Sequence, residues 1–333
     1  MARLGWAVVG TGDVSRSIAS DLRIADANGL AAVCSRSVDR AETFAREFGF
    51  AKAHGSVEEL LADGAVDIVY IGTPHATHVD LAISALEAGK HVLIEKPLGV
   101  TAAQVQRVET AARAAGRFAM EGMWMKFNPT YRSYVADVRS GAIGQVTSMR
   151  AYFGLPFAPR DSQRWAGERA SSTLLDQGIY PVTLAHDVFG DPTSITATAD
   201  VRDDGVDVSI EATLGFGGGR FAHIAASMVG FVEPTASVSG TRGWMSLAAP
   251  FWATDNYERH TGDLGHALMQ PESVQFARDG NGYVPMLRAV ADAVAAGLTE
   301  HPLHPLSSSI AVARILDSIR ATSAAQTITE TAS

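Results

Sequence analysis

The chain has 333 residues, of which 47% are hydrophobic and 19% are charged, with a formal net charge of −9. This is the composition of a globular protein with room for two domains and substantial cores. The acidic balance argues against a nucleic-acid-binding surface, because affinity for the phosphate backbone needs clustered Lys and Arg.

Short apolar runs alternate with helical patterns over the first 123 residues. Strands are predicted at residues 4–9, 30–34, 66–71, 91–94 and 118–123. Helices are predicted at residues 13–24, 39–48, 78–88 and 101–115, with a further one opening at Ser56. The run at 66–71 is continuously apolar, as expected when helices cover both faces of a sheet. The alternation predicts an α/β domain at residues 1–123 with a doubly wound parallel sheet.

The pattern changes at Trp124, and we place a second domain at residues 124–333. A helix at 131–140 precedes a strand at 146–153. Apolar residues then occupy every second position from 206 to 216 and from 222 to 228, on either side of three glycines. This predicts a hairpin in a large, mainly antiparallel sheet with one polar face. Helices are predicted at 285–296 and 307–320, and the tail from Ala321 should fray.

Nothing in the sequence points to a membrane or secretory protein. No apolar stretch is long enough to span a bilayer, and the amino terminus does not resemble a cleavable signal. The single cysteine, Cys34, excludes an intrachain disulfide and a cysteine-rich metal site. No His, Asp or Glu cluster has metal-ligand spacing, so we expect no metal. A cytoplasmic enzyme or binding protein is the expected class.

A glycine-rich turn follows the first predicted strand. Two glycines allow a tight turn and the close approach of a pyrophosphate to the amino terminus of the next helix. Ser15 stands where the full dinucleotide fingerprint has its last glycine, so a purely structural turn is the alternative. The residues expected to hold a dinucleotide here are Gly10, Thr11, Gly12, Asp13 and Val14.

The end of the second strand indicates which dinucleotide is used. An NAD site usually has Asp or Glu there, bound to the ribose 2′-hydroxyl. This chain has Ser35 and Arg36 instead, and no carboxylate before Asp39. A hydroxyl and a guanidinium suit a 2′-phosphate, so NADP is predicted over NAD; a surface loop capped by Arg36 is the alternative.

Two further strand ends complete the predicted cofactor site. Thr73 and Pro74 follow the third long strand, where the nicotinamide half should cross, and His78 is expected to begin the next helix rather than to act as a catalyst. Glu95 and Lys96 follow the fourth. In open α/β folds, ligands bind at this carboxyl edge of the sheet. An ordinary surface lysine before a turn proline is the alternative.

Asp176 and Tyr180 are four residues apart, so on a helix they project from one face. Hydride transfer at a carbinol carbon needs a group that moves the hydroxyl proton. A phenol is a weak acid, with a pKa of about 10, and a nearby ammonium group favours the phenolate. Lys96 and Tyr180 thus form a coherent pair, which Asp176 can orient. A buried helix tyrosine and a helix cap are the alternatives.

Aromatic residues are candidates for the substrate side. Trp124 and Phe153 can form an apolar wall over the nicotinamide or belong to a core between domains. Trp165, with Arg160 and Arg164, lies in a polar loop that can reach substrate. His186 is off the face of Tyr180 and is expected to be structural or peripheral.

Together these residues resemble the Gfo/Idh/MocA family of nicotinamide-dependent oxidoreductases over nearly the whole chain. The motifs that carry the resemblance are Gly10-Thr11-Gly12, Thr73-Pro74, Ala-Gly-Lys-His-Val at 88–92, Glu95-Lys96-Pro97, Leu-Leu-Asp-Gln-Gly-Ile-Tyr-Pro at 174–181 and the helices after Tyr283. The family implies a Rossmann domain followed by an α+β domain. It also supports catalytic roles at the matching positions Lys96, Tyr180 and Asp176.

Glu-Gly-Met-Trp at 121–124 and Phe-Asn-Pro at 127–129 are similar to the branch of dimeric dihydrodiol dehydrogenases and NADP-dependent D-xylose 1-dehydrogenases. That branch implies NADP and sugar or vicinal diol substrates. Inositol dehydrogenase-like members have histidine where Tyr180 stands, which makes inositol a poorer candidate. The family's glycine run before the aspartate is replaced by Ser171-Ser172-Thr173.

The expected function is therefore an NADP-dependent dehydrogenase or reductase acting on a sugar, polyol or diol. The alternatives are a non-catalytic NADP-binding sensor and an NAD-dependent glycosidase of the same family, against which Ser35 and Arg36 argue. The second face of the antiparallel sheet is expected to pack against a copy of itself, giving a homodimer or homotetramer, as the family implies. A monomer with a solvated sheet face is the alternative.

Overall fold

The computed structural model describes residues 4–25, 29–156, 166–167 and 170–325. The chain divides into two compact units. The first combines Met1–Asn128 with Arg278–Ile310, and the second combines Pro129–Ala277 with Ala311–Ser333. Residues 278–310 thus return to the amino-terminal unit, which the sequence pattern did not indicate.

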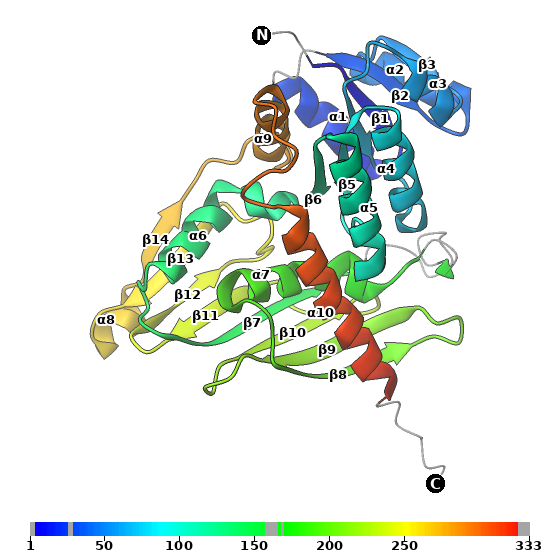
Figure 1. Cartoon of the computed structure of the whole chain (residues 1–333). Helices are drawn as coiled ribbons and strands as arrows, with labels where there is room; N and C mark the ends of the chain where they lie inside the picture. The colour runs from blue at the N-terminus through cyan, green and yellow to red at the C-terminus, as the bar shows by residue number, and fades with distance from the viewer. Residues whose placement is uncertain (1–3, 26–28, 157–165, 168–169, 326–333) are drawn as a thin grey trace. The chain divides into compact units, whose positions relative to one another are not determined.

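The first unit is built on a six-stranded parallel sheet with the strand order β3-β2-β1-β4-β5-β6 (Figure 1). Its strands are β1 (Trp6–Val9), β2 (Leu30–Cys34), β3 (Lys52–His54), β4 (Ile68–Ile71), β5 (His91–Glu95) and β6 (Ala119–Gly122). Its helices are α1 (Asp13–Ile24), α2 (Val38–Phe48), α3 (Val57–Ala62), α4 (His78–Glu87), α5 (Ala102–Ala115) and α9 (Val284–Ala295). Every residue of β1 and β4 is buried, so helices cover both sheet faces. The predicted doubly wound sheet is confirmed.

Local capping chemistry sets the ends of these helices. The Ser56 hydroxyl accepts from the Glu59 amide at 3.2 Å, and the Thr101 hydroxyl accepts from the Gln104 amide at 3.3 Å. Gly49 ends α2 in the left-handed region at φ 83°, which costs glycine little. The helix starts predicted at Ser56 and Thr101 and the helix end predicted at residue 48 are confirmed.

The second unit is built on an eight-stranded sheet with the order β14-β13-β12-β11-β7-β10-β9-β8. Its strands are β7 (Val146–Gly154), β8 (Ser194–Val201), β9 (Asp207–Gly215), β10 (Phe221–Ser227), β11 (Ala236–Gly240), β12 (Gly243–Leu247), β13 (Asn256–Thr261) and β14 (Glu272–Gln275). All neighbours are antiparallel except β7 and β10. The predicted large, mainly antiparallel sheet is confirmed, and so is the hairpin, which turns between β9 and β10 through Gly217, Gly218 and Gly219 at positive φ.

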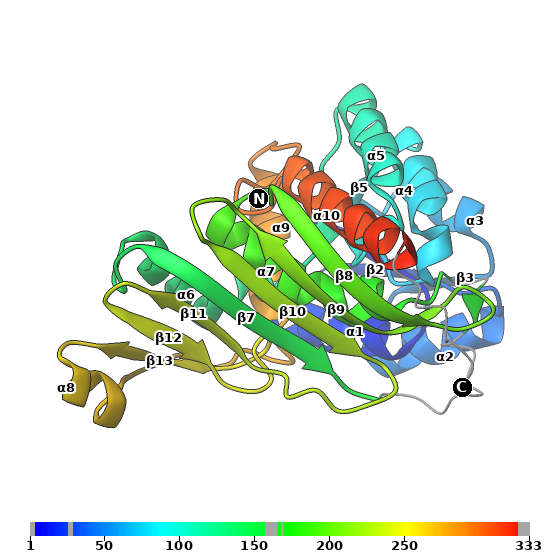
Figure 2. The same ribbon diagram turned by 90° about the horizontal axis from the view of Figure 1, so that it is seen from below.

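One face of this sheet carries helices and the other does not, within the residues described for this unit. The covering helices are α6 (Pro129–Arg139), α7 (Ile179–Phe189) and the part of α10 (Leu306–Ala325) from Ala311 onward. Figure 2 shows β7 to β10 with these helices on their far side. On β9, Val208, Ile210, Ala212 and Leu214 are buried beneath the helices, and the alternate residues point outward.

Several elements differ from the sequence prediction. Strands β3, β8 and β11 to β14 and the short helix α8 (Leu264–Met269) were not predicted. Helix α10 continues to Ala325, so the prediction that the tail frays from Ala321 was wrong for residues 321–325; the remaining residues of the tail lie outside those described. Its alanines favour the helix and offset the serines and threonines. Among the described helices, none combines the length and the apolar character needed to cross a bilayer.

Candidate active site

The glycine turn between β1 and α1 forms a cradle that fits a dinucleotide pyrophosphate. Gly10 has φ +101°, and a Cβ there would lie 2.6 Å from the Gly72 carbonyl oxygen. Gly12 is the N-cap of α1 and has no side chain to cap the helix, and the space beside it is open. A pyrophosphate can therefore approach the first-turn amides, where the helix dipole favours negative charge.

The end of β2 lies beside this turn. The Gly10 amide donates to the Cys34 carbonyl at 2.9 Å, which places Ser35 and Arg36 directly beyond the cradle. Ser35 is half-buried and Arg36 is exposed. The Ser37 hydroxyl caps α2 by accepting a hydrogen bond from the Arg40 backbone amide at 3.4 Å, so it is engaged locally. The corner offers a hydroxyl and a guanidinium where a 2′-phosphate of NADP would lie.

The lysine turn, Lys96-Pro97-Leu98, follows β5 at the same edge of the sheet. Lys96 is half-buried, and its peptide bond to Pro97 is cis. Glu95 is turned into the protein: its Oε1 accepts from the Tyr70 hydroxyl at 2.9 Å and its Oε2 from the Lys96 amide at 3.1 Å. Glu95 thus orders the backbone beneath the lysine, and its contact with a cofactor stays a prediction.

Glu121, at the end of β6, is a residue of this edge whose role the sequence did not reveal. Its Oε1 accepts from the Leu98 amide at 2.9 Å, and its Oε2 accepts from Ser309 at 2.7 Å and His304 at 3.1 Å. Burial acts to raise the pKa of this carboxyl, but these donors, led by His304, outweigh it and hold the pKa below its ordinary value. Glu121 remains ionised and anchors the lysine turn.

The loop after β4 carries the remaining predicted cofactor residues. The hydroxyls of Thr73 and Thr77 lie 2.7 Å apart, and Pro74 precedes a 3-10 turn at His75–Thr77. His78 begins α4, as predicted, and is fully buried. Its two ring nitrogens face backbone carbonyls, so it can reach a cofactor only through the loops that it contacts.

Asp176 and Tyr180 belong to the second unit and flank a change in helical geometry. The segment Leu174–Gly178 is a π-helical turn that leads into α7. The sequence predicted an ordinary helix here. Pro181 has no amide hydrogen to continue a regular ladder, which accounts for the widened turn before it. Such turns are frequent at functional sites.

Asp207 holds the start of this segment, a role that the sequence analysis did not predict. Its Oδ2 accepts from the Leu174 amide at 2.7 Å, and the Ser172 hydroxyl accepts from the Leu175 amide at 3.1 Å. Burial raises the pKa of Asp207, and the hydrogen bonds from Ser172 and Leu174 offset this only in part. In the Ser-Ser-Thr run at 171–173, Ser172 therefore supplies a capping hydroxyl, where the family that the sequence resembles has glycines.

Three aromatic rings meet at Tyr180. Phe153 and Trp252 are stacked, with ring centroids 3.5 Å apart, and lie 5.5 and 5.7 Å from the Tyr180 ring. All three are buried. Trp252 is distant in sequence and follows no recognisable motif, so only the fold reveals it. The group provides an apolar surface beside the phenol.

Trp124 belongs to the first unit, where it is buried with its ring 4.9 Å from that of Tyr283. Trp165, Arg160 and Arg164 lie outside the described residues. His186, on α7, lies 3.5 Å from an Asp191 carboxylate oxygen near the helix end.

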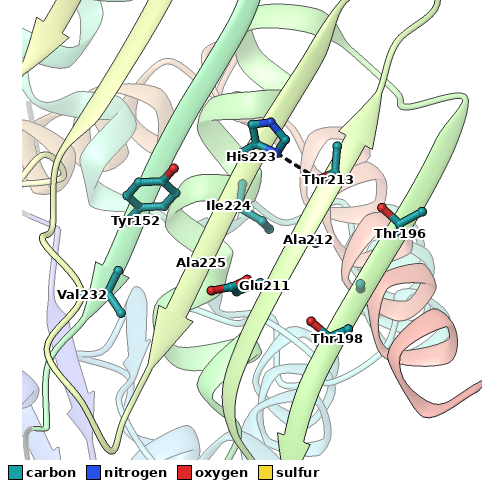
Figure 3. A pocket seen from close by; sticks show the side chains of 11 residues that line it. Tyr152, Thr196, Thr198, Glu211, Ala212, Thr213, His223, Ile224, Ala225 and Val232 are labelled. Carbon is teal, nitrogen blue, oxygen red and sulfur yellow. Dashed lines mark hydrogen bonds between the residues drawn. The ribbon is translucent and has the colours of Figure 1, made fainter. Parts of the chain in front are cut away.

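A hollow of about 520 Å³ lies on the outer face of the second unit's sheet (Figure 3). Glu211, Thr213 and His223 line it, and the Thr213 hydroxyl and His223 Nδ1 are 2.9 Å apart. It contains none of the predicted catalytic residues. No group of three or more His, Cys, Asp or Glu side chains in the described ranges could hold a metal ion.

Comparison with known proteins gives consistent matches along the chain. A family model described as an oxidoreductase family with an NAD-binding Rossmann fold matches residues 4–123, and a GFO/IDH/MocA C-terminal domain model matches residues 131–246. A trans-1,2-dihydrobenzene-1,2-diol dehydrogenase from Oryctolagus cuniculus is 37% identical over 295 residues, covering 87% of this chain and 89% of the relative.

Solved structures match over almost the full length. A 3-ketoreductase from Actinomadura kijaniata, in complex with NADP and TDP-benzene, is 27% identical with a TM-score of 0.85, covering 96% of this chain and 98% of that one. An aldose-aldose oxidoreductase from Caulobacter crescentus has a TM-score of 0.86 at 23% identity, covering 97% of this chain and 98% of that one. The second likeness concerns the fold alone.

Proposed function

This chain belongs to the Gfo/Idh/MocA family of oxidoreductases, and we propose that it is an NADP-dependent dehydrogenase or reductase acting on a CH–OH group of a vicinal diol, sugar or polyol. One observation carries most of the weight: the lysine turn and the glycine cradle lie at the carboxyl edge of one parallel sheet, where open α/β folds bind ligands. The relative at 37% identity favours a vicinal diol as the first substrate to test.

The cofactor preference rests on the corner beyond β2. Ser35 and Arg36 offer a neutral hydroxyl and a cation, whereas an NAD site usually offers a carboxylate there. A carboxylate would repel a 2′-phosphate, and a guanidinium can pair with two of its oxygens. NADP is therefore the proposed cofactor, and NAD is the weaker alternative.

The proposed chemistry divides between a hydride and a proton. The nicotinamide, when bound, accepts or supplies the hydride. Tyr180 is the proposed acid–base group that takes the proton from the substrate hydroxyl or returns it. Lys96 supplies the positive charge that favours the phenolate, and Asp176 orients the lysine or a substrate hydroxyl. Asp207 and Glu121 hold the backbone segments that carry these groups.

The surroundings of Tyr180 support the substrate class. Phe153 and Trp252 form a stacked aromatic surface next to the phenol. Such a surface suits the apolar face of a sugar or the ring of a cyclic diol. A neutral sugar, polyol or diol is therefore the proposed substrate.

A substrate panel tests the proposal. Purified protein is mixed with NADP or NAD and with pentoses, hexoses, inositols and aromatic trans-diols, and formation of the reduced cofactor is followed by absorbance. We expect turnover with at least one diol or sugar and a higher kcat/KM with NADP. Tight binding of NADPH without turnover across the panel would contradict an enzyme and favour a sensor. Activity without net consumption of cofactor would favour the glycosidase.

We also propose that the protein associates through the outer face of the eight-stranded sheet. That face mixes half-exposed and exposed side chains, including Tyr152, Thr198 and Glu211, around the hollow of Figure 3. Twofold packing of such a face on a copy of itself gives the commonest closed symmetry. Light scattering at micromolar concentration should give at least twice 35.1 kDa, and the monomer mass would contradict the proposal.

A matched pair of variants locates the interface. Thr198→Arg places a long cation on the outer face, and Thr110→Arg makes the same substitution at an exposed position of α5. Only Thr198→Arg should lower the mass measured by light scattering.

We propose the cytoplasm as the compartment, since the buried thiol of Cys34 suits a reducing environment. Cell fractionation tests the location.

A further inference from the structure

His78 joins two loops of the first unit that carry different parts of the proposed site. Its Nε2 lies 2.8 Å from the carbonyl oxygen of Thr73, in the loop after β4. Its Nδ1 lies 2.8 Å from the carbonyl oxygen of Pro97, in the lysine turn after β5. The ring is fully buried, so no bulk water competes for either contact. One imidazole thus spans the cofactor loop and the lysine turn.

Both partners of this ring are acceptors, which limits what a neutral imidazole can do. A neutral ring carries one N–H and donates to one carbonyl only, whereas the protonated ring donates to both. Burial lowers the pKa of His78, and Lys96 acts in the same direction; the two carbonyls and Glu121 oppose them. The neutral ring can therefore donate to one loop at a time, and a hydrogen bond to one carbonyl excludes a hydrogen bond to the other.

The lysine turn has a second anchor on its other side. The Leu98 amide donates to Glu121, which Ser309 and His304 hold in turn. Glu121 fixes the amide side of the turn, and His78 fixes its carbonyl side at Pro97. Glu121 makes no hydrogen bond to the Thr73 loop among those of the described residues, so the connection to the cofactor loop runs through His78.

We propose that His78 is a positioning residue that couples the cofactor loop at Thr73 and Pro74 to the lysine turn at Lys96 and Pro97. By donating its one N–H to either carbonyl, the ring links the loop that should contact the nicotinamide half to the backbone that carries the lysine. This inference rests on the proposed function, because it assigns cofactor binding to one loop and proton transfer to the other. His78 acts through these loops and does not touch the reacting atoms.

Two amide substitutions separate the two contacts. In His78→Asn the side-chain amide can take the place of Nδ1 and donate to Pro97, but it cannot reach Thr73. In His78→Gln the amide can take the place of Nε2 and donate to Thr73, but not to Pro97. Loss of one such bond changes a rate or binding constant by about tenfold. We expect the Asn variant to weaken NADPH binding and raise the KM for NADP while kcat changes little.

The Gln variant should give the opposite split, with NADPH affinity near that of the wild type and a kcat lowered by about tenfold. NADPH affinity is measured by fluorescence titration, which needs no substrate, and kcat by steady-state turnover. His91→Gln is the control: His91 lies at the far end of β5, where its Nδ1 accepts from the Phe118 amide at 3.0 Å. That variant should lower the unfolding temperature without separating kcat from cofactor affinity.

Equal losses of kcat and affinity in both His78 variants, or no loss in either, would overturn the proposal. Absence of wild-type turnover would instead count against the proposed function, while the titrations would still report on His78. Should both variants fail to fold, wild-type protein with ¹⁵N-labelled histidine decides the matter. Saturating NADPH should then shift the His78 ring-nitrogen signals, assigned through contacts with Thr73 and His75. Unchanged signals would contradict the coupling.

Discussion

Ser15 lies directly against Gly72: its Oγ is 3.4 Å from the Gly72 carbonyl oxygen and would be 2.5 Å from a Cβ added at position 72. Ser15 stands where the dinucleotide fingerprint has its last glycine, whose small size lets helix and strand pack closely. In this protein the glycine of the helix–strand contact is Gly72, which follows β4, and the helix contributes Ser15. The departure from the fingerprint is compensated by Gly72, and the cradle keeps its close packing.

Gly72→Ala should therefore destabilise the protein. The added methyl group would meet the Ser15 hydroxyl and also the Tyr70 ring, at 2.7 Å, and overpacking of this kind costs about 1–3 kcal/mol. Gly64→Ala is the matched control, because Gly64 is exposed and has no atom within 4 Å of its added Cβ. Urea unfolding measures both. Equal free energies of unfolding for the two variants would contradict the packing argument.

Arg36→Asp should reverse the cofactor preference. An aspartate there would accept from a ribose 2′-hydroxyl and repel a 2′-phosphate, so kcat/KM for NADP should fall about ten- to a hundredfold while that for NAD holds or rises. Arg46→Asp makes the same charge change in the last turn of α2 and should leave the ratio unchanged. Wild-type protein that prefers NAD by kcat/KM would show the assignment of Ser35 and Arg36 to be wrong.

The thiol of Cys34 should be unreactive in the folded protein. Burial, followed by the carboxylates of Glu58 and Glu59, raises its pKa from 9.0 to about 11, which lowers the thiolate fraction at pH 8 about a hundredfold. Cys34 is the only cysteine, so labelling with a thiol-specific disulfide reagent reports on it alone. We expect native protein to react at least a hundredfold more slowly than protein in guanidinium. Rapid stoichiometric labelling of the native state would be inconsistent with this.

Asp63 should contribute a pH-dependent part of the stability. The hydrogen bond from Lys52, at 2.8 Å, and that from the Ala65 amide lower its pKa from 3.8 to about 2. A pKa lowered by folding gives stability that is present above about pH 4 and lost as the pH falls towards 2. Asp63→Asn should cost about 1 kcal/mol or less at pH 7, because the Lys52 side chain is half exposed.

The free energies of unfolding of Asp63→Asn and of the wild type should become equal as the pH falls from 4 to 2. Urea unfolding at a series of pH values measures both. Asp80→Asn serves as the control, since Asp80 pairs with Arg107 at 3.0 Å but is 77% exposed. It should show little effect at any pH. A constant difference for Asp63→Asn down to pH 2 would mean that its carboxylate charge does not stabilise the fold.

Strong local patterns made much of the fold predictable. Continuous apolar runs indicated the buried parallel strands, and capping residues such as Ser56 and Thr101 marked helix starts that the structure confirms. Strands β11 to β14 escaped prediction because each is only four to six residues long; β14 (Glu272–Gln275), for example, is mostly exposed and carries little apolar alternation. Their strand conformation depends on pairing with neighbours in the sheet.

The candidate site was predictable only where chemistry follows a motif. The glycine turn, Ser35 and Lys96 follow strands in sequence, so their positions at one sheet edge could be inferred. The partners that hold the lysine turn come from distant segments: Glu121 bonds to Leu98, and His304 reaches Glu121 across 183 positions. No local pattern marks such contacts, and the same is true of Trp252 beside Tyr180.

We propose that Lys96 takes part in proton transfer rather than in holding the dinucleotide. The most direct test of this proposal compares NADPH binding and turnover in wild type and Lys96→Ala, with circular dichroism to establish folding. We expect NADPH affinity within about threefold of the wild type and a kcat lowered about a hundredfold or more, the usual effect of losing an acid–base group. A folded Lys96→Ala protein with near-wild-type turnover would contradict it.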